Sequence, residues 1–152
     1  MSVSVQWKGI KETDRAIRAV PGLTRKGAER ALEATGLLVQ NDAKQRVLKG
    51  PKTGRIYQKY NPRRTHQASA PDESPASDTG TLVRNIIYDF RKAALEVFII
   101  AGTKYAKALE YGTRDIGGFI DQRPFLRPAL TERIDQIVKL FIAYSREELR
   151  RG

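Results

Sequence analysis

A long amphipathic helix is predicted between residues 24 and 48, because apolar and small side chains recur there at steps of three and four. Thr24 is the expected N-cap of this helix. The stripe consists of Ala28, Ala31, Leu32, Thr35, Leu38, Val39, Ala43 and Val47. Gly27 and Gly36 each cost such a helix up to about 1 kcal/mol relative to alanine. Two interpretations stay open: the glycines mark close packing against another element or subunit, or they are tolerated in a long helix.

Two strands joined by a turn are predicted further along, at residues 81–90 and 94–102, where β-branched and aromatic residues are dense. In the second strand Val97 and Ile99 face one way and Phe98 and Ile100 the other, so we expect cover on both faces. A short strand at 2–7, a brief helix at 13–20, a short helix at 105–111 and a C-terminal helix at 127–150 complete the elements. The predicted fold is a single α+β domain over residues 1–152, with a small antiparallel sheet packed against a long N-terminal helix and a C-terminal helix.

Residues 49–80 are predicted to form a long extended loop between the helix and the sheet, because they hold four prolines and three glycines. The chain has a net charge of +11, and much of the excess lies at the front of this loop. Basic and aromatic residues interleave there, and we predict a subunit or partner interface at Lys52, Arg55, Tyr57, Lys59, Tyr60, Arg63 and Arg64. A solvated loop, contact with an acidic surface and contact with nucleic acid all remain open. We expect this loop to become ordered only against a partner chain.

The stretch "LEYGTRDIGGFIDQRPFLRPAL", residues 109–130, interrupts two helical runs with glycines and prolines but keeps aromatic residues. Gly112 is expected to end the short helix with positive φ, and Pro128 to lie near the first turn of the next one. Gly117 and Gly118 allow a sharp turn between them. Phe119 and Phe125 are assigned two alternative roles: sealing this elbow onto the core, or anchoring into the next subunit.

The residue inventory leaves little room for catalysis or metal binding. The chain has no cysteine and one histidine, His66, which excludes thiolate sites and two-histidine sites within one chain. A triad of His66 with Ser69 and Asp72 would lie in a loop with no rigid support. Glu110 is expected to pair with Arg114 or Arg123 instead of forming a carboxylate pair with Asp115 or Asp121. We therefore predict no catalytic residue, no metal and no cofactor. The N-terminus shows no signal-peptide pattern, and no apolar run in the sequence approaches the length of a membrane span.

Three segments taken in order resemble the neck or tail-completion family of tailed bacteriophages. They are "HQASAPDESPASDTGTLVRNI" (His66–Ile86), "IIAGTKYAKALEYGT" (Ile99–Thr113) and "RPFLRPAL" (Arg123–Leu130). The family pattern is an Ala-Pro segment before Thr-Gly-x-Leu, then Tyr-Ala followed by Glu-Tyr/Phe-Gly-Thr, then Pro-Phe-Leu-x-Pro-Ala. The matching residues here are Ala70 and Pro71; Thr79, Gly80 and Leu82; Tyr105, Ala106, Glu110, Tyr111, Gly112 and Thr113; and Pro124, Phe125, Leu126, Pro128 and Ala129.

This resemblance implies a non-enzymatic virion protein that assembles as a homo-oligomeric ring in the neck and completes or joins the tail to the head. It implies neighbouring head-connector and tail proteins as partners, a ring of six-fold or twelve-fold symmetry, and contact with packaged DNA as a further expectation. The protein would be in the host cytoplasm during assembly and in the virion afterwards. The basic segment between Gly50 and Gln67 is longer than in the shorter family members. The alternative from charge alone is a basic nucleic-acid-binding module.

Overall fold

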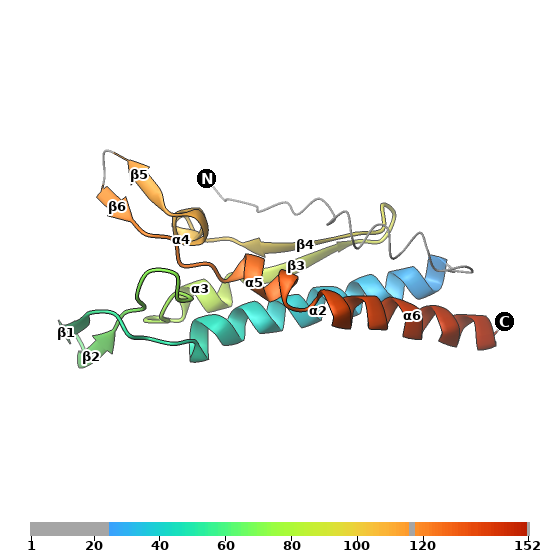
Figure 1. The fold of residues 1–152 in the computed structure, drawn as a ribbon, viewed down its shortest axis with the longest axis horizontal. Helices are drawn as coiled ribbons and strands as arrows, with labels where there is room; N and C mark the ends of the chain where they lie inside the picture. Colours follow the sequence, from blue (N-terminus) through green and yellow to red (C-terminus); the bar gives the residue numbers. More distant parts are fainter. Residues whose placement is uncertain (1–24, 116–117, 152) are drawn as a thin grey trace.

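The computed structural model describes residues 25–115 and 118–151. Helix α2 (Arg25–Lys49) extends along most of the molecule, and α6 (Ile134–Arg151) lies beside it (Figure 1). The antiparallel hairpin of β3 (Ile86–Arg91) and β4 (Glu96–Ala101) packs on another side of α2. The predicted α+β class is confirmed. The strand predicted at 2–7, the helix predicted at 13–20, the N-cap Thr24 and Gly117 lie outside the described residues.

The side of α2 that faces the core contains the residues of the predicted stripe, together with Gly27 and Gly36. Its buried residues are Gly27, Ala28, Ala31, Thr35, Gly36, Val39, Ala43 and Val47, and Leu32 and Leu38 pack partly buried against the core. A Cβ atom on Gly36 would lie 2.7 Å from Cδ2 of Tyr88 and 2.9 Å from Cγ2 of Val97. The helix therefore needs glycine at this position to approach the sheet, which confirms the close-packing interpretation for Gly36.

The β3–β4 hairpin turns one face to α2, with Tyr88 opposite Ile99 and Ile86 opposite Ala101 in its register. Ile86, Ile99 and Ala101 are buried. On the other face Phe98 and Ile100 are half-buried, whereas Ile87 is 49% exposed. Among the described residues, the expected cover is thus complete on the face toward α2 and partial on the other face.

The strand predicted at 81–90 is wrong in its first half, because α3 (Thr81–Arg84) forms a single helical turn there. Gly80 adopts φ 74 before this turn, and the backbone N–H of Arg84 donates to the carbonyl of Gly80 at 3.0 Å. Leu82 is buried as a result. Density of β-branched residues is a weak guide here, since tertiary burial of one leucine outweighs local strand propensity.

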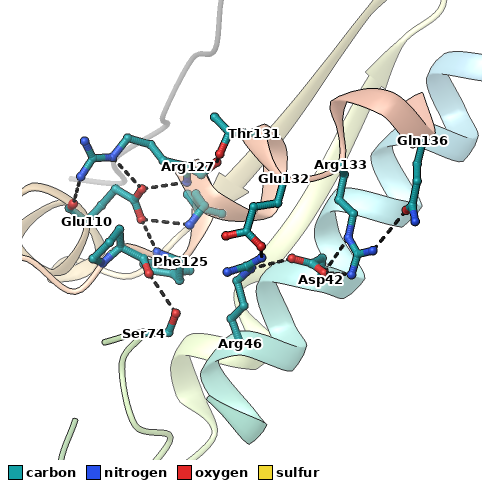
Figure 2. A network of polar contacts seen from close by, with 12 residues as sticks. Asp42, Arg46, Ser74, Glu110, Phe125, Arg127, Thr131, Glu132, Arg133 and Gln136 are labelled. Atoms are coloured by element: carbon teal, nitrogen blue, oxygen red, sulfur yellow. Dashed lines mark hydrogen bonds and ion pairs between the residues drawn. The ribbon is translucent and has the colours of Figure 1, made fainter. Parts of the chain in front are cut away.

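The predicted C-terminal helix is two helices, α5 (Leu126–Thr131) and α6, separated at Glu132 and Arg133. A group of ion pairs holds this break against α2 (Figure 2). Nε of Arg46 donates to Asp42 at 2.6 Å, and Nε of Arg133 donates to the same carboxylate at 2.9 Å. Burial alone would raise the pKa of Asp42, but the hydrogen bonds from Arg133 and Arg46 outweigh it, so the pKa is lowered.

The C-terminal part of α6 forms ion pairs with the first turns of α2. Arg30 pairs with Glu148 at 2.7 Å and with Glu147 at 3.1 Å, and its guanidinium lies 4.6 Å from the centre of the Tyr144 ring. Between these polar contacts Ile137 and Phe141 are buried. The two helices therefore enclose an apolar seam with charged pairs along its sides.

The prediction of a loop throughout residues 49–80 is wrong for its middle part. Strands β1 (Ile56–Tyr60) and β2 (Arg63–Gln67) pair there as an antiparallel hairpin, and the turn between them is Asn61–Pro62. Residues 68–80 contain no helix or strand and connect the hairpin to α3. The strand formers Ile56, Tyr57 and Tyr60 explain the hairpin, since one proline at a turn does not prevent strands on either side. Ordering against a partner chain stays a prediction.

Candidate partner interface

The β1–β2 hairpin has one face toward the body of the subunit and one face in solvent. Its register places Lys59 opposite Arg64 and Tyr57 opposite His66, and on the other face Tyr60 opposite Arg63. All six residues of that second face are exposed: Ile56, Gln58, Tyr60, Arg63, Thr65 and Gln67. A two-stranded hairpin is only marginally stable by itself, so the contacts of its first face matter for its position.

Asp78 fastens this hairpin to the body. Its carboxylate forms ion pairs with Lys59 and Arg64, and its backbone carbonyl accepts a bond from Arg64 at 3.2 Å. Nδ1 of His66 lies 3.9 Å from the same carboxylate. Hydrogen bonding from Lys59 lowers the pKa of Asp78. Asp78 lies outside the basic stretch, and its single carboxylate offsets one of the two positive charges of Lys59 and Arg64.

The remaining predicted residues of this segment divide into two groups. Nζ of Lys52 donates to the carbonyl of Leu48 at 3.1 Å and so caps the C-terminal end of α2. Tyr57 and Tyr60 are 45% and 82% exposed, and the guanidinium of Arg55 lies 5.5 Å from the centre of the Tyr57 ring. Arg63 is exposed beside Tyr60. The structure thus leaves Arg55, Tyr57, Tyr60 and Arg63 accessible to a partner.

A second hairpin follows α4 (Ala106–Tyr111) and consists of β5 (Thr113–Asp115) and β6 (Gly118–Ile120). Phe119 is 72% exposed in this hairpin, and Arg114 lies 5.1 Å from the centre of its ring. Sealing of the elbow by Phe119 is therefore wrong. Phe125, in contrast, is 0% exposed. Its core-packing alternative is confirmed, and its assignment to a partner interface is wrong because the side chain is enclosed within the subunit.

Both hairpins project from the same end of the molecule, where α2 ends, and α6 ends at the opposite end (Figure 1). Within that end the β1–β2 hairpin and the β5–β6 hairpin lie on opposite sides in this view. Exposed aromatic residues are normal singly but suggest an interaction site when they gather. The sequence-predicted interface residues that remain accessible are thus divided over two separate projections.

The elbow between α4 and α5 is built around Glu110, which is 0% exposed (Figure 2). Its carboxylate accepts backbone N–H groups from Phe125 at 2.9 Å, Leu126 at 3.0 Å and Arg127 at 2.8 Å. Nε of Arg127 lies 3.3 Å from the same carboxylate. These N–H groups belong to the first turn of α5, which has no partner for them within the helix. Glu110 therefore caps α5 from a distance of fifteen residues in the chain.

Glu110 was expected to pair with Arg114 or Arg123. This prediction is wrong, because the guanidinium that pairs with Glu110 belongs to Arg127. One sequence signal could have indicated the cap. The segment before α5 reads Arg123-Pro124-Phe125 and offers no Ser, Thr, Asp or Asn at the start of the helix. A buried helix start without such a residue needs an acceptor from elsewhere, and Glu110 is the acidic residue of the preceding short helix.

The connector at 68–80 is bound to the same elbow. The backbone N–H of Asp72 donates to the carbonyl of Gln122 at 2.9 Å, and Nε2 of Gln122 donates to the Asp72 carboxylate at 2.8 Å. Ser74 donates to the carbonyl of Pro124 at 2.9 Å. The segments that carry the resemblance are thus joined in space: the connector contacts the elbow, and the elbow is capped by α4.

Gly112 has φ 71 as predicted, but its ψ of 168 is extended, so it is not a left-handed helical cap. A Cβ atom there would lie 3.0 Å from the carbonyl oxygen of Ile120. Gly112→Val is therefore expected to lower the free energy of unfolding by about 1–3 kcal/mol. Urea denaturation followed by circular dichroism measures this loss. Gly102→Val is the control, because a Cβ at Gly102 meets its nearest atom at 3.7 Å; equal losses in both variants would contradict a specific strain at Gly112.

Two of the residues considered for a catalytic triad, His66 and Ser69, have defined surroundings in the structure. His66 lies beside Asp78, whose carboxylate is already bound by two cations, and Ser69 is buried. Across residues 25–115 and 118–151 no three His, Asp or Glu side chains gather in a way that could hold a metal ion. In the same ranges no helix is both long and apolar enough to cross a membrane.

Comparison with known proteins gives one family match. A family model described as "Bacteriophage HK97-gp10, putative tail-component" matches residues 11–112. Neither the curated proteins nor the solved structures yield a match to this chain. The matched range includes α2, the β1–β2 hairpin, the β3–β4 hairpin and α4 with Glu110.

Proposed function

Because this chain belongs to the HK97-gp10-like family of bacteriophage tail components, we propose that it forms a homo-oligomeric ring in the neck of the virion. In this proposal the ring completes the tail or joins it to the head, and its role is structural and not catalytic. Its partners are copies of itself and the adjacent head-connector and tail proteins. The protein assembles in the host cytoplasm and remains in the virion.

The observation that carries this proposal is the pair of exposed hairpins at one end of the subunit. Tyr60 and Phe119 are 82% and 72% exposed there, on strands that pair with only one neighbour each within residues 25–115 and 118–151. Unpaired strand edges and exposed aromatic rings are costly features in a protein that works alone. Both become useful when the subunit is completed by neighbours in a closed assembly.

The alternative of a nucleic-acid-binding module is favoured by the net charge of +11. The hairpin weakens this alternative, because Lys59 and Arg64 share the carboxylate of Asp78, which offsets one of their two positive charges. Contact of packaged DNA with the remaining cations would be secondary to assembly. A DNA-binding module would lose affinity steeply as salt rises, whereas ring assembly built on aromatic contacts would tolerate the same change.

A hairpin replacement tests the proposal. The backbone N–H of Gly54 donates to the carbonyl of Ala68 at 2.9 Å, so the two chain ends below the hairpin are adjacent. Residues 55–67 can therefore be replaced by a short Gly-Ser linker without stretching the core. We expect the variant subunit to fold with nearly unchanged thermal stability. Phage that lack the natural protein and are supplied with the variant should produce heads and tails that fail to join.

The readouts are the melting temperature of the purified subunit, the infectious titre and electron micrographs of the lysate. A matched control replaces the exposed residues Lys139 and Arg146 of α6 by serine, which removes charge far from both hairpins and should leave the titre unchanged. Normal particles from the hairpin replacement, or a neck that contains no ring of this chain in wild-type particles, would refute the proposed function.

A further inference from the structure

The tip of the β1–β2 hairpin presents an aromatic side chain and a positive charge side by side. Tyr60 and Arg63 are the last cross-strand pair before the turn, so their side chains lie next to each other on the solvent face. Lys59 and Arg64, their neighbours in sequence, are paired with Asp78. Arg63 has no ion pair with any residue in the described part of the chain. The tip therefore carries an unneutralised guanidinium beside an exposed aromatic ring.

The β5–β6 hairpin borders a hollow of about 390 Å³. Its lining includes the aromatic and aliphatic side chains of Tyr111, Phe119 and Ile120, all at least one-third exposed. Arg114 also lines the hollow, with its guanidinium 5.1 Å from the centre of the Phe119 ring. Asp121 lines the hollow as well and is exposed. Its backbone carbonyl accepts a bond from Arg123 at 3.0 Å, while its carboxylate forms no ion pair within the described ranges. The hollow thus combines an apolar wall with one cation, which lies against Phe119, and one carboxylate that forms no ion pair among the described residues.

We infer that Tyr60 and Arg63 of one subunit dock into the hollow of an adjacent copy of this chain, with Arg63 paired to Asp121 of that copy. This inference rests on the proposed ring. The ring of Tyr60 lies against Phe119 and Tyr111 of the adjacent copy, where aromatic pairs in desolvated pockets contribute strongly to binding. The opposite charges set the register of the contact and disfavour wrong pairings.

The positions of the two surfaces favour a second copy as the occupant. The β1–β2 hairpin and the β5–β6 hairpin lie on opposite sides of the same end of the subunit (Figure 1). The hollow is lined by residues 111–114 and 119–122 and by no residue of β1 or β2, so the tip does not fill its own hollow. They are also different surfaces, and a contact between two different surfaces of identical chains is heterologous. Such a contact repeats from copy to copy and closes into a ring when the rotation between copies allows it. The same geometry leaves the opposite end of the subunit free for other virion proteins.

Disulfide crosslinking tests this contact, because the natural chain contains no cysteine. The double variant Tyr60→Cys with Phe119→Cys places thiols at two highly exposed positions, 82% and 72% in the wild-type residues. Oxidation of assembled particles should convert the protein to a ladder of covalent multimers on a non-reducing gel, since a disulfide requires Cα atoms within about 7 Å. Each single-cysteine variant should stay monomeric on the same gel. A dimer from Tyr60→Cys alone would show tip-to-tip contact and overturn the inference.

Charge reversal gives a second test that does not depend on cysteine chemistry. Arg63→Asp and Asp121→Arg should each reduce the titre of complemented phage by at least about tenfold, and the double variant should recover most of it. Circular dichroism should show all three variants folded, because both side chains are exposed. No recovery in the double variant would overturn the inference. Intact rings of the wild-type protein, together with no crosslink in assembled particles of the double-cysteine variant, would reject this docking mode and leave the proposed function standing. Absence of rings in wild-type particles would reject both.

Discussion

Glu110→Ala is expected to lower the free energy of unfolding by about 3–5 kcal/mol, because it removes a buried acceptor from three backbone N–H groups and one guanidinium. The donors from Phe125, Leu126 and Arg127 lie 2.8–3.0 Å from the carboxylate in the native subunit. In the variant they remain buried or half-buried without this partner. Urea or guanidinium denaturation followed by circular dichroism gives the change directly.

Two matched variants separate the cap from general effects of losing a glutamate. Glu110→Gln keeps one acceptor oxygen in nearly the same shape, so we expect a smaller loss than for alanine. Glu33→Ala removes an exposed glutamate from α2 and should change the free energy of unfolding by less than about 0.5 kcal/mol. A loss below about 1 kcal/mol for Glu110→Ala would show that the cap contributes little to stability.

Phe141→Asp is expected to abolish the folded subunit at room temperature. Phe141 is 4% exposed between α6 and α2. Truncating a buried phenylalanine already costs about 3–5 kcal/mol, and an unpaired carboxylate in the same place adds the cost of burying a charge. The sum approaches the whole stability of an ordinary domain, which is about 5–15 kcal/mol. Loss of the cooperative thermal transition and of soluble expression would be the measured result.

The control for this variant lies two residues away on the same helix. Ala143 is exposed on α6, so Ala143→Asp introduces the same side chain on the solvent face and should melt close to wild type. If Phe141→Asp also melted close to wild type, the packing of α6 against α2 would be incorrect. Similar damage from both variants would instead mean that aspartate disturbs the helix wherever it is placed.

Local periodicity predicted those parts of the fold whose determinants are local. The stripe from Ala28 to Val47 identified α2. For Gly36 the sequence left close packing and a tolerated glycine both open, and the contacts with Tyr88 and Val97 decided between them. In the C-terminal segment the apolar spacing of Leu130, Ile134, Ile137 and Phe141 continues across the break between α5 and α6, and it therefore concealed the break. The ion pairs of Asp42 with Arg133 and Arg46 hold that break, and Asp42 lies too far away in the chain for periodicity to reveal this.

The candidate interface was predictable in composition but not in geometry. Its basic and aromatic content was visible, yet the support of the hairpin comes from Asp78, fourteen residues after Arg64 in the chain. Exposure of Phe119 and burial of Phe125 also could not be distinguished from sequence. Both are aromatic residues in a glycine- and proline-rich stretch, and only the position of the α5 start, fixed by Glu110, places one inside and the other outside.

The attachment of the β1–β2 hairpin has a consequence for how proteins of this family can diverge. Its two chain ends meet at the hydrogen bonds between Gly54 and Ala68 and between Ala68 and Arg55, and its polar contacts with the body converge on Asp78. The core therefore presents the same pair of adjacent ends to a long hairpin, a short one or a simple turn. Insertions and deletions at this site can change which surfaces a subunit contacts without changing the packing of its core.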